Sequence, residues 1–555
     1  MIPIFSWILV YLLVFGFPPS ITAQCRVPCR VSAFTPFLPS GVTIEKTYEV
    51  PGGSGLNGSY GEGAPLDLGH PTNATNLPHL CAVTVRVSLP NAPSSYRFGL
   101  FLPPNCTWNS RFLAVGNYAQ AGGINWADMG QGPHYGMATL STDTGHNSVE
   151  SDLSWGLNNP QALQDWGWRA LKGSVEIGKA LVEGYYGRRI SYSYWSGCST
   201  GGRQGLKQVQ VAPDAFDGVL VGAPAWDTQH LFPWITRLAA LNRPGTAGFL
   251  DNTGIELLRG AVQRQCVLER TEATRGRVAD PFDGCALDWS RIRCPGDDPA
   301  QCLTDAQVST AMSVYADYHS NATTGGRATF PGMPLGSEAL WGPFLVGGPQ
   351  VEFNEAYERY WLYNNASWSL ADYDEGRVVA DSERINPGNA TADDFNVSRF
   401  RDGGGKILMY HGRADGIVPT GSSQAYYDRT VEAMGEVDDF FRLFHVPGMY
   451  HCWYTDTTVN APWIMGGAGQ AVRLQKDLNF GQGWSVPGFE GNGTYDALVA
   501  LMDWVESKGA KPVEKVIATT YDGTRLKQRP LCKWPAKAQY KGAGDVYKAD
   551  SWSCV

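Results

Sequence analysis

The residue of this sequence best suited to nucleophilic chemistry is a serine in a glycine-rich turn. Residues 197–201 read Gly-Cys-Ser-Thr-Gly, the Gly-x-Ser-x-Gly pattern that places a serine in a strained turn between a strand and a helix. Glycine is favoured two positions before and after the serine because larger side chains would collide there. We therefore predict that Ser199 is a nucleophile and that the backbone amide of Thr200 donates to an oxyanion. The alternative is a glycine-rich structural turn, since so short a pattern also arises by chance.

The general base that such a serine requires is expected to be a histidine later in the chain. Four of the nine histidines lie well C-terminal to the strands that follow the serine, namely His319, His411, His445 and His451. His319 falls in a segment that lacks the pattern of the core. We predict His451 as the general base, because the cysteine that follows it could tie it to the serine.

One cysteine lies directly beside each of these two candidates. Cys198 directly precedes Ser199, and Cys452 directly follows His451. A disulfide between them would hold the Cα atoms of serine and histidine within about 14 Å, because bonded cysteines lie about 4.4 to 6.8 Å apart and each chain step adds about 3.8 Å. The alternative is that Cys198 is a small buried thiol and Cys452 pairs elsewhere.

A carboxylate must orient the histidine and stabilise its charged form. Residues 406–410 form a short apolar strand, and Asp415 lies in the turn that follows it, which is where the third member of such a triad is expected. We predict Asp415 for this role; its alternative role is turn capping beside a glycine. Asp456 is the fallback, although it follows His451 in the chain and has no strand directly before it.

A second oxyanion donor is expected in the loop after an early strand. Residues 116–123, Gly-Asn-Tyr-Ala-Gln-Ala-Gly-Gly, follow the apolar residues 112–115. We favour the backbone amide of Ala119. The alternative is that these residues only form a tight turn between a strand and a helix.

The elements that would position these residues follow an α/β pattern. Short apolar runs alternate with glycine loops and amphipathic stretches from residue 111, with a helix predicted at 161–183 and a strand at 190–195. Residues 82–87 alternate at period two and predict a strand at one edge of the sheet. The pattern resumes at 406–410 and 441–446 and ends with a helix at 495–507. At 555 residues the chain exceeds the size of one usual core, which indicates a second unit.

That second unit is expected between residues 226 and 395, where aromatics, sequons and four cysteines replace the strand–helix alternation. We interpret residues 226–395 as an inserted lid. The α/β core would then have a first part at residues 24–225, which carries the nucleophile, and a second part at residues 396–555, which carries the acid and the base.

The start of the chain and its sequons indicate the secretory route. The apolar run at residues 4–17 and the small-residue ending near residue 23 predict a signal peptide over residues 1–23; a membrane anchor is the alternative, but the run is short and closed by two prolines. Eight Asn-x-Ser/Thr sequons and an even set of twelve cysteines suit an oxidising, extracellular environment. We expect a secreted protein that is free of the membrane after removal of the signal.

Composition excludes some classes of partner. The formal net charge is −9 with a pI near 5.6, and no basic run interleaved with aromatic residues is present. The sequence therefore predicts no nucleic-acid partner. We expect a small or uncharged partner.

Several motifs together resemble the secreted tannase and feruloyl esterase family. They are Gly-Cys-Ser-Thr-Gly-Gly-Arg-Gln-Gly at 197–205, Asp-Gly at 217–218, Gly-Ala-Pro-Ala at 222–225, Ser-Thr-Asp-Thr-Gly-His at 141–146, His-Cys at 451–452 and the tail from Arg-Pro-Leu-Cys at 529–532 to Cys554. The resemblance covers nearly the whole mature chain. It implies an α/β-hydrolase core with a lid inserted after the strand that follows the nucleophile. It also places the family's paired-cysteine triad on Ser199, Asp415 and His451.

The resemblance implies a serine carboxylic ester hydrolase that is similar to feruloyl esterases and acts on esters of phenolic acids. The expected partner is a small-molecule or polysaccharide-linked phenolic ester. The alternative within the family is a tannase that acts on galloyl esters. A third hypothesis, from another class, is a binding protein that has kept the fold without turnover. No organic cofactor is needed for the mechanism.

The sequence departs from the family pattern in two places, at the family's calcium loop and beside the predicted catalytic histidine. After Cys266 many members have an Asp-rich calcium loop, whereas residues 267–272 here read Val-Leu-Glu-Arg-Thr-Glu. The sequence therefore predicts no metal site, and calcium in the lid would need a variant site formed by Glu269, Glu272, Asp280 and Asp283. The second departure is bulk, because Tyr450 and Trp453 flank the histidine–cysteine pair where the family often has small residues.

Local spacing and the resemblance together suggest the remaining disulfides. They pair Cys266 with Cys285, Cys294 with Cys302, and Cys532 with Cys554. Two further bonds are expected among Cys25, Cys29, Cys81 and Cys106.

Overall fold

The structure is a computed structural model, and it describes residues 28–53, 55–62, 73–88, 94–295, 301–320, 329–346, 351–477, 486–521 and 525–555. The predicted signal peptide and Cys25 lie outside the described residues. No helix of the described segments combines the length and the apolar character needed to cross a bilayer.

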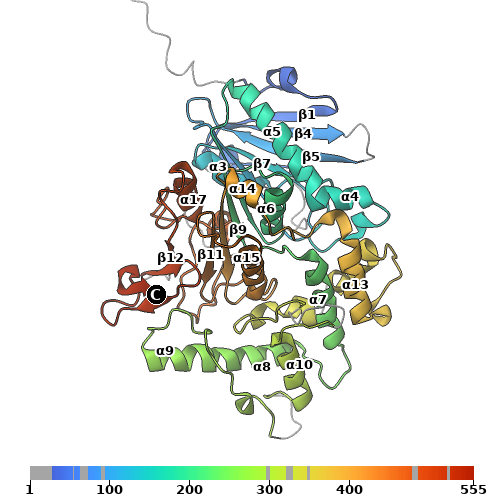
Figure 1. The fold of residues 1–555 in the computed structure, drawn as a ribbon, viewed down its shortest axis with the longest axis vertical. Coiled ribbons are helices and arrows are strands. Elements are labelled where there is room, and N and C mark those ends of the chain that lie inside the picture. The colour runs from blue at the N-terminus through green and yellow to red at the C-terminus, as the bar shows by residue number, and fades with distance from the viewer. Residues whose placement is uncertain are drawn as a thin grey trace, which may run out of the picture.

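A nine-stranded mixed sheet forms the centre of the molecule (Figure 1). Its strands, in spatial order, are β1 (Val42–Val50), β4 (Leu80–Ser88), β5 (Ser95–Leu102), β7 (Ala138–Thr142), β6 (Arg111–Val115), β8 (Tyr192–Cys198), β9 (Gly218–Gly222), β10 (Lys406–Gly412) and β11 (Phe441–Val446). The pairs from β7 to β11 are parallel, and the first three pairs are antiparallel. The early segment thus forms the antiparallel edge that its period-two pattern predicts.

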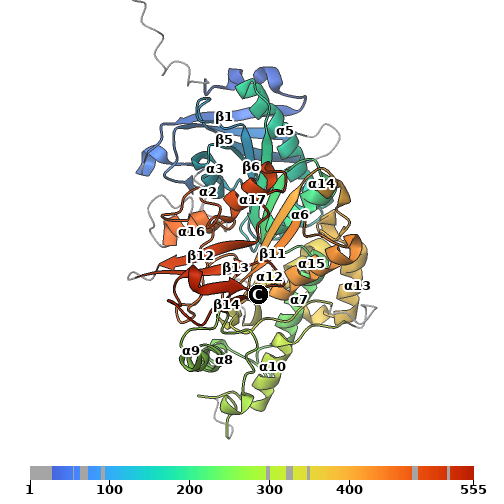
Figure 2. The ribbon, with the colours of Figure 1, turned by 60° about the vertical axis from the view of Figure 1, so that its left-hand side comes forward.

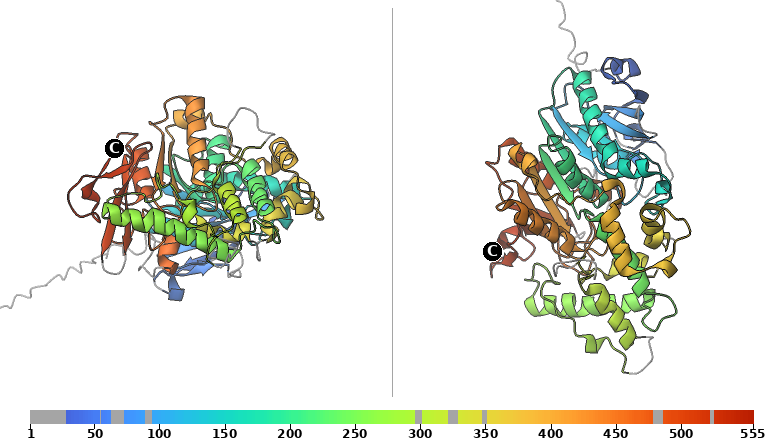
Figure 3. Two further views of the ribbon diagram at one scale, coloured as in Figure 1. Left: turned by 90° about the horizontal axis from the view of Figure 1, so that it is seen from below. Right: turned by 45° about the vertical axis from the view of Figure 1, so that its right-hand side comes forward.

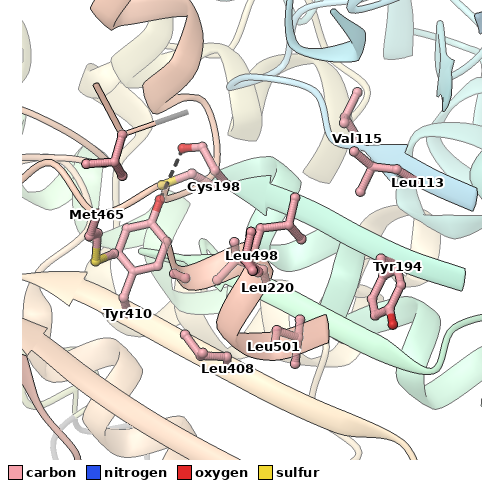
Figure 4. Close-up of a cluster of buried hydrophobic side chains, with 14 of the residues drawn as sticks. Leu113, Val115, Tyr194, Cys198, Leu220, Leu408, Tyr410, Met465, Leu498 and Leu501 are labelled. Atoms are coloured by element: carbon pink, nitrogen blue, oxygen red, sulfur yellow. Dashed lines mark hydrogen bonds between the residues drawn. The ribbon is translucent and has the colours of Figure 1, made fainter. Parts of the chain in front are cut away.

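Helices cover both faces of the parallel strands, which is why these strands are buried almost throughout. On one face lie α5 (Ala170–Tyr186), α6 (Thr200–Val211) and α15 (Thr420–Met434), and their apolar side chains share one core with β8 and β10. On the other face lies α17 (Ala497–Glu506). Figure 4 shows Leu498 and Leu501 of α17 beside Leu220 and Leu408 of the sheet. The predicted α/β fold is confirmed.

Residues 226–395 lie between β9 and β10 in the chain, and their described residues add no strand to the sheet. Their helices include α7 (Thr228–Leu241), α8 (Asn252–Val262), α9 (Glu269–Thr274), α10 (Asp305–Tyr315) and α13 (Glu375–Ile385), which lie together below and beside the sheet (Figures 1 and 3). A third hydrophobic cluster, centred on Trp234, Trp341 and Trp361, fills this segment. The segment therefore buries much of its own apolar surface.

The C-terminal tail forms two small hairpins, which the sequence did not predict. Strand β12 (Lys515–Tyr521) pairs with β13 (Leu526–Cys532), and β14 (Ala538–Tyr540) pairs with β15 (Trp552–Cys554). Figure 2 shows these hairpins beside β11 and close to α9. Backbone bonds join Trp534 to Leu443 of β11, so the tail is fixed to the last strand of the sheet.

Candidate active site

Ser199 occupies the turn between β8, which ends at Cys198, and α6, which begins at Thr200. Its backbone is strained, with φ 62° and ψ −124°, a conformation that L-residues rarely adopt. Close packing explains the glycines: a Cβ on Gly197 would lie 2.6 Å from the carbonyl carbon of Gly201, and one on Gly202 would lie 2.7 Å from the Gly222 oxygen. The serine itself is only half-buried. The turn thus presents its hydroxyl rather than packing it away.

Two backbone amides, one directly after this serine and one in the loop after β6, have no acceptor among the described residues. Thr200 is the first residue of α6, so its N–H points out of the helix N-terminus. Ala119 has a positive φ of 41° in the loop after β6. Neither amide donates a hydrogen bond to another described residue. The loop lies against the turn, because a Cβ on Gly116 would come 2.4 Å from the Cα of Gly201.

Asp415 and His451 are directly bonded. Asp415 lies in the loop after β10, is fully buried, and accepts the Nδ1–H of His451 on Oδ2 at 2.7 Å. Its Oδ1 accepts the backbone amides of Ile417 at 2.8 Å and Val418 at 3.0 Å. Burial acts to raise the pKa of Asp415, but the charge of His451 and hydrogen bonds from His411 and His451 hold it well below its ordinary value. Asp415 is therefore an ionised carboxylate aimed at the imidazole.

The other ring nitrogen of His451 is available for a proton. Its Nε2 is buried and has no hydrogen-bond partner among the described residues. Cys198 and Cys452 form a disulfide with a Cα–Cα distance of 6.0 Å. One chain step on each side then places the Cα atoms of Ser199 and His451 within about 14 Å of each other. The structure thus brings the predicted serine, histidine and carboxylate to one place.

A second imidazole on the same carboxylate was missed from sequence. His411 is fully buried and its Nε2 lies 2.9 Å from Oδ2 of Asp415. His411 and Asp415 are four positions apart across the end of β10, but this spacing alone does not show that the ring turns toward the carboxylate, and no role was assigned to His411.

The fallback carboxylate takes no part in this arrangement. Asp456 is paired with Arg259 of α8 at 2.7 Å and accepts the hydroxyl of Tyr450 at 3.2 Å. Among the described residues, His451 is bonded to Asp415 and not to Asp456. Asp456 instead links the segment after β9 to the loop that carries the histidine.

Aromatic bulk forms one wall beside the loop of Ala119. The rings of Tyr118 and Trp453 meet edge to face with centroids 6.0 Å apart. The guanidinium of Arg473 lies 4.4 Å from the centre of the Trp453 ring. Tyr118 also donates its hydroxyl to Asp128 at 2.5 Å. Because each of these aromatic residues has a further polar contact, we infer that the pair is fixed in position.

Three of the four residues considered for a variant calcium site are paired with basic side chains. Glu269 is paired with Arg291 at 2.6 Å, and Asp280 with Arg413 at 3.0 Å. Asp283 pairs with Lys537 at 2.7 Å. The described residues contain no group of three or more His, Cys, Asp or Glu that could hold a metal ion. Glu269, Asp280 and Asp283 thus serve as ion-pair partners.

The other disulfides follow local spacing. Cys266–Cys285, Cys294–Cys302 and Cys532–Cys554 are present as predicted. Of the N-terminal four, Cys29 is bonded to Cys81. Cys106 is exposed and forms no disulfide within the described part of the chain, and Cys25 lies outside that part.

Comparison with known proteins decides the family. The family model described as "Tannase and feruloyl esterase" matches residues 81–555. The chain belongs to this family. As a member of the tannase and feruloyl esterase family it is a carboxylic ester hydrolase with an α/β-hydrolase fold.

Individual members of the family are similar over nearly the whole length. "Probable feruloyl esterase B-1" of Aspergillus fumigatus is 31% identical over 522 residues, 93% of this chain and 92% of that protein. The crystal structure of an esterase from Aspergillus oryzae superposes with a TM-score of 0.81 at 28% identity, covering 95% of this chain and 99% of that one. The crystal structure of feruloyl esterase B from Aspergillus oryzae gives a TM-score of 0.80 at 27% identity, covering 97% and 100%.

Proposed function

We propose that this chain is a secreted esterase that hydrolyses esters of phenolic acids by a serine mechanism, with Ser199 as nucleophile, His451 as general base and Asp415 as orienting carboxylate. The observation that carries the proposal is the 2.7 Å bond between Asp415 and His451 beside a disulfide that ties the histidine to the serine turn. Relatives named feruloyl esterase support the choice of phenolic acyl groups.

The mechanism follows from the geometry. Ser199 attacks the ester carbonyl while Nε2 of His451 takes the hydroxyl proton, and Asp415 stabilises the imidazolium that forms. The amides of Thr200 and Ala119, which lack acceptors among the described residues, bind the oxyanion of the tetrahedral intermediate. His451 then gives its proton to the leaving alcohol. Water hydrolyses the acyl-enzyme by the same route, so no cofactor takes part.

A planar aromatic acid suits the surroundings of this centre. The fixed rings of Tyr118 and Trp453 offer apolar faces and edges next to the oxyanion loop, and aromatic acids gain from burial and stacking against such rings. In this proposal residues 226–395 act as the lid over the core, residues 24–225 and 396–555 form the core, and five disulfides suit an extracellular enzyme.

The test compares wild type with Ser199→Ala on methyl ferulate, methyl gallate and p-nitrophenyl acetate. We expect turnover by wild type and a loss of about 10⁴-fold or more in the variant, because the nucleophile is removed. Ser174→Ala is the matched control, since Ser174 is a buried serine of α5 that has no part in the proposed triad. Equal background rates in wild type and Ser199→Ala would favour the binding-protein hypothesis. The ratio of ferulate to gallate turnover decides between feruloyl esterase and tannase activity.

A further inference from the structure

His411, the last buried polar side chain of β10, is used by nothing in the mechanism above. Its ring is fully buried, although burial of an imidazole without partners is costly. Its Nε2 lies 2.9 Å from Oδ2 of Asp415 and 2.8 Å from the carbonyl oxygen of Val418. Its Nδ1 lies 2.7 Å from the hydroxyl of Ser423. Every polar atom of the ring is therefore bonded.

These partners fix the hydrogen on the ring. The carboxylate of Asp415 is ionised and a carbonyl oxygen can only accept, so Nε2 must carry a hydrogen and donate it. Ser423 is fully buried in α15 and can donate its own hydrogen to Nδ1. A neutral ring that receives from Ser423 and gives to Asp415 satisfies all of these groups at once.

Among the described residues that are hydrogen-bonded to His411, Asp415 is the ionised one. His445 of β11 lies beside it in register, and burial lowers the pKa of His445 to about 3, so that ring is neutral. Arg413 follows in the same loop, but its guanidinium is paired with Asp280 and Asp283. His451 reaches His411 only through Asp415, since both rings donate to the same oxygen. The two imidazoles thus compete for one negative charge.

We propose that His411 is a positioning residue of the triad: it holds the carboxylate of Asp415 in place and shares its charge, and so sets the pH at which His451 takes up a proton. This inference rests on the proposed function of Ser199, Asp415 and His451. The donor from His411 withdraws charge from Oδ2, which makes the protonated form of His451 less favourable. The ester hydrolase therefore stays active to lower pH than it would without His411.

The test uses His411→Leu, which removes both polar atoms, and His411→Gln, whose side-chain amide can still donate to Asp415. We expect His411→Leu to lower kcat by about tenfold or more with little change in KM, because only transition-state stabilisation is affected. The acidic limb of the kcat/KM profile should move up by about half a pH unit, since His451 then keeps its proton to higher pH. His411→Gln should recover most of both effects.

Ser423→Ala reports on the same network without touching the ring. Loss of its donor weakens the opposite N–H of His411 as a donor, so the acidic limb should move in the same direction by a smaller amount. A thermal unfolding curve, recorded for each variant, tests whether that variant is folded. An unmoved acidic limb in folded His411→Leu and Ser423→Ala would mean that His411 only fills space. A His411→Gln variant that recovers neither kcat nor the acidic limb would contradict the role of the donor to Asp415. Activity retained by Ser199→Ala would instead overturn the proposed function itself.

Discussion

A single carboxylate decides the electrostatics of the site. Asp415 has no exposed surface yet accepts four hydrogen bonds, two on each oxygen. A buried carboxylate without such donors would become neutral near pH 7, as burial alone requires. Here the donors outweigh burial, so the pKa of Asp415 stays below its ordinary value and the charge is available to His451 at every working pH.

Asp415→Asn should lower kcat by about 10³- to 10⁴-fold with KM nearly unchanged, because the amide keeps the shape but not the charge that orients His451. Steady-state kinetics on an aryl ester measures both constants. The conservative change Asp456→Asn is the control, since Asp456 is not bonded to the base and should leave kcat within a few-fold. A kcat loss of equal size in both variants would contradict the assignment of the carboxylate.

Sequence patterns alone point to the three residues of the proposed triad, because each follows a local rule. Ser199 lies in a short motif, Asp415 follows an apolar strand, and His451 adjoins a cysteine. His411 could not be assigned in this way, because its role depends on the direction in which a buried ring turns at the end of β10. Spacing along the chain contains no information about that direction.

At the scale of elements, a disulfide joins the turn before α6 to the loop after β11. Cys198 and Cys452 are 254 residues apart in the chain, and both are buried. Cys452 has a positive φ of 69°, and His451 precedes it directly. The bond therefore constrains the backbone of the base as well as the distance between the two loops.

Cys198→Ala/Cys452→Ala should lower both stability and kcat, because the unfolded chain gains freedom and the loop of His451 loses its tie. The expected loss of stability is about 2–5 kcal/mol. Cys532→Ala/Cys554→Ala is the matched control, as it opens a bond over 22 residues in the tail. The unfolding temperature should fall in both variants, whereas kcat should fall only in Cys198→Ala/Cys452→Ala. An unchanged kcat in Cys198→Ala/Cys452→Ala would show that the bond does not position His451.

Most elements of the core follow from sequence patterns, but their surroundings do not. Strand β10 is found at Lys406–Gly412 and β11 at Phe441–Val446, where apolar runs predict them. The tail hairpins were not predicted, because β13 contains a proline and several polar residues and so lacks the apolar pattern of a strand. It forms a strand by pairing with β12. The packing of an edge segment depends on which surface is left open, and this is known only once the fold is formed.

At the scale of the whole molecule, the segment between β9 and β10 is tied to the core by side chains of α6. Arg203 is fully buried and donates to the carbonyl oxygens of Gly167 and Ala390 at 2.7 and 3.3 Å. Lys207 donates to the carbonyl of Thr391 at 2.7 Å. The helix that begins directly after Ser199, the proposed nucleophile, therefore also fixes the end of the inserted segment.

The inserted segment should make stability fall as pH rises. Burial raises the pKa of Glu358 to about 8, so between its unfolded pKa of about 4.3 and pH 8 the folded state holds a proton that the unfolded state has released. Stability is then lost progressively over this window. Thr236 bonds the Glu358 carboxyl at 2.8 Å, and an amide could make the same contact.

Glu358→Gln should therefore raise the unfolding temperature more at pH 8 than at pH 5, measured by calorimetry in matched buffers. Glu355→Gln is the control, because Glu355 of the same segment is paired with Arg359 and its replacement should not gain stability at high pH. A constant difference between Glu358→Gln and wild type at both pH values would contradict the assignment of the raised pKa.

The separation of the two sulfurs of the Cys198–Cys452 bond also sets an order of events during synthesis. At about 5–20 residues per second, a ribosome needs roughly 10–50 seconds to add the 254 residues that separate them. Within that interval Cys266, Cys285, Cys294 and Cys302 appear, and each has its partner only 19 or 8 residues away. These thiols can be oxidised locally before Cys452 emerges, which leaves Cys198 for its distant partner. The proposed catalytic centre is thus complete only after His451 and Cys452 have been synthesised, late in translation.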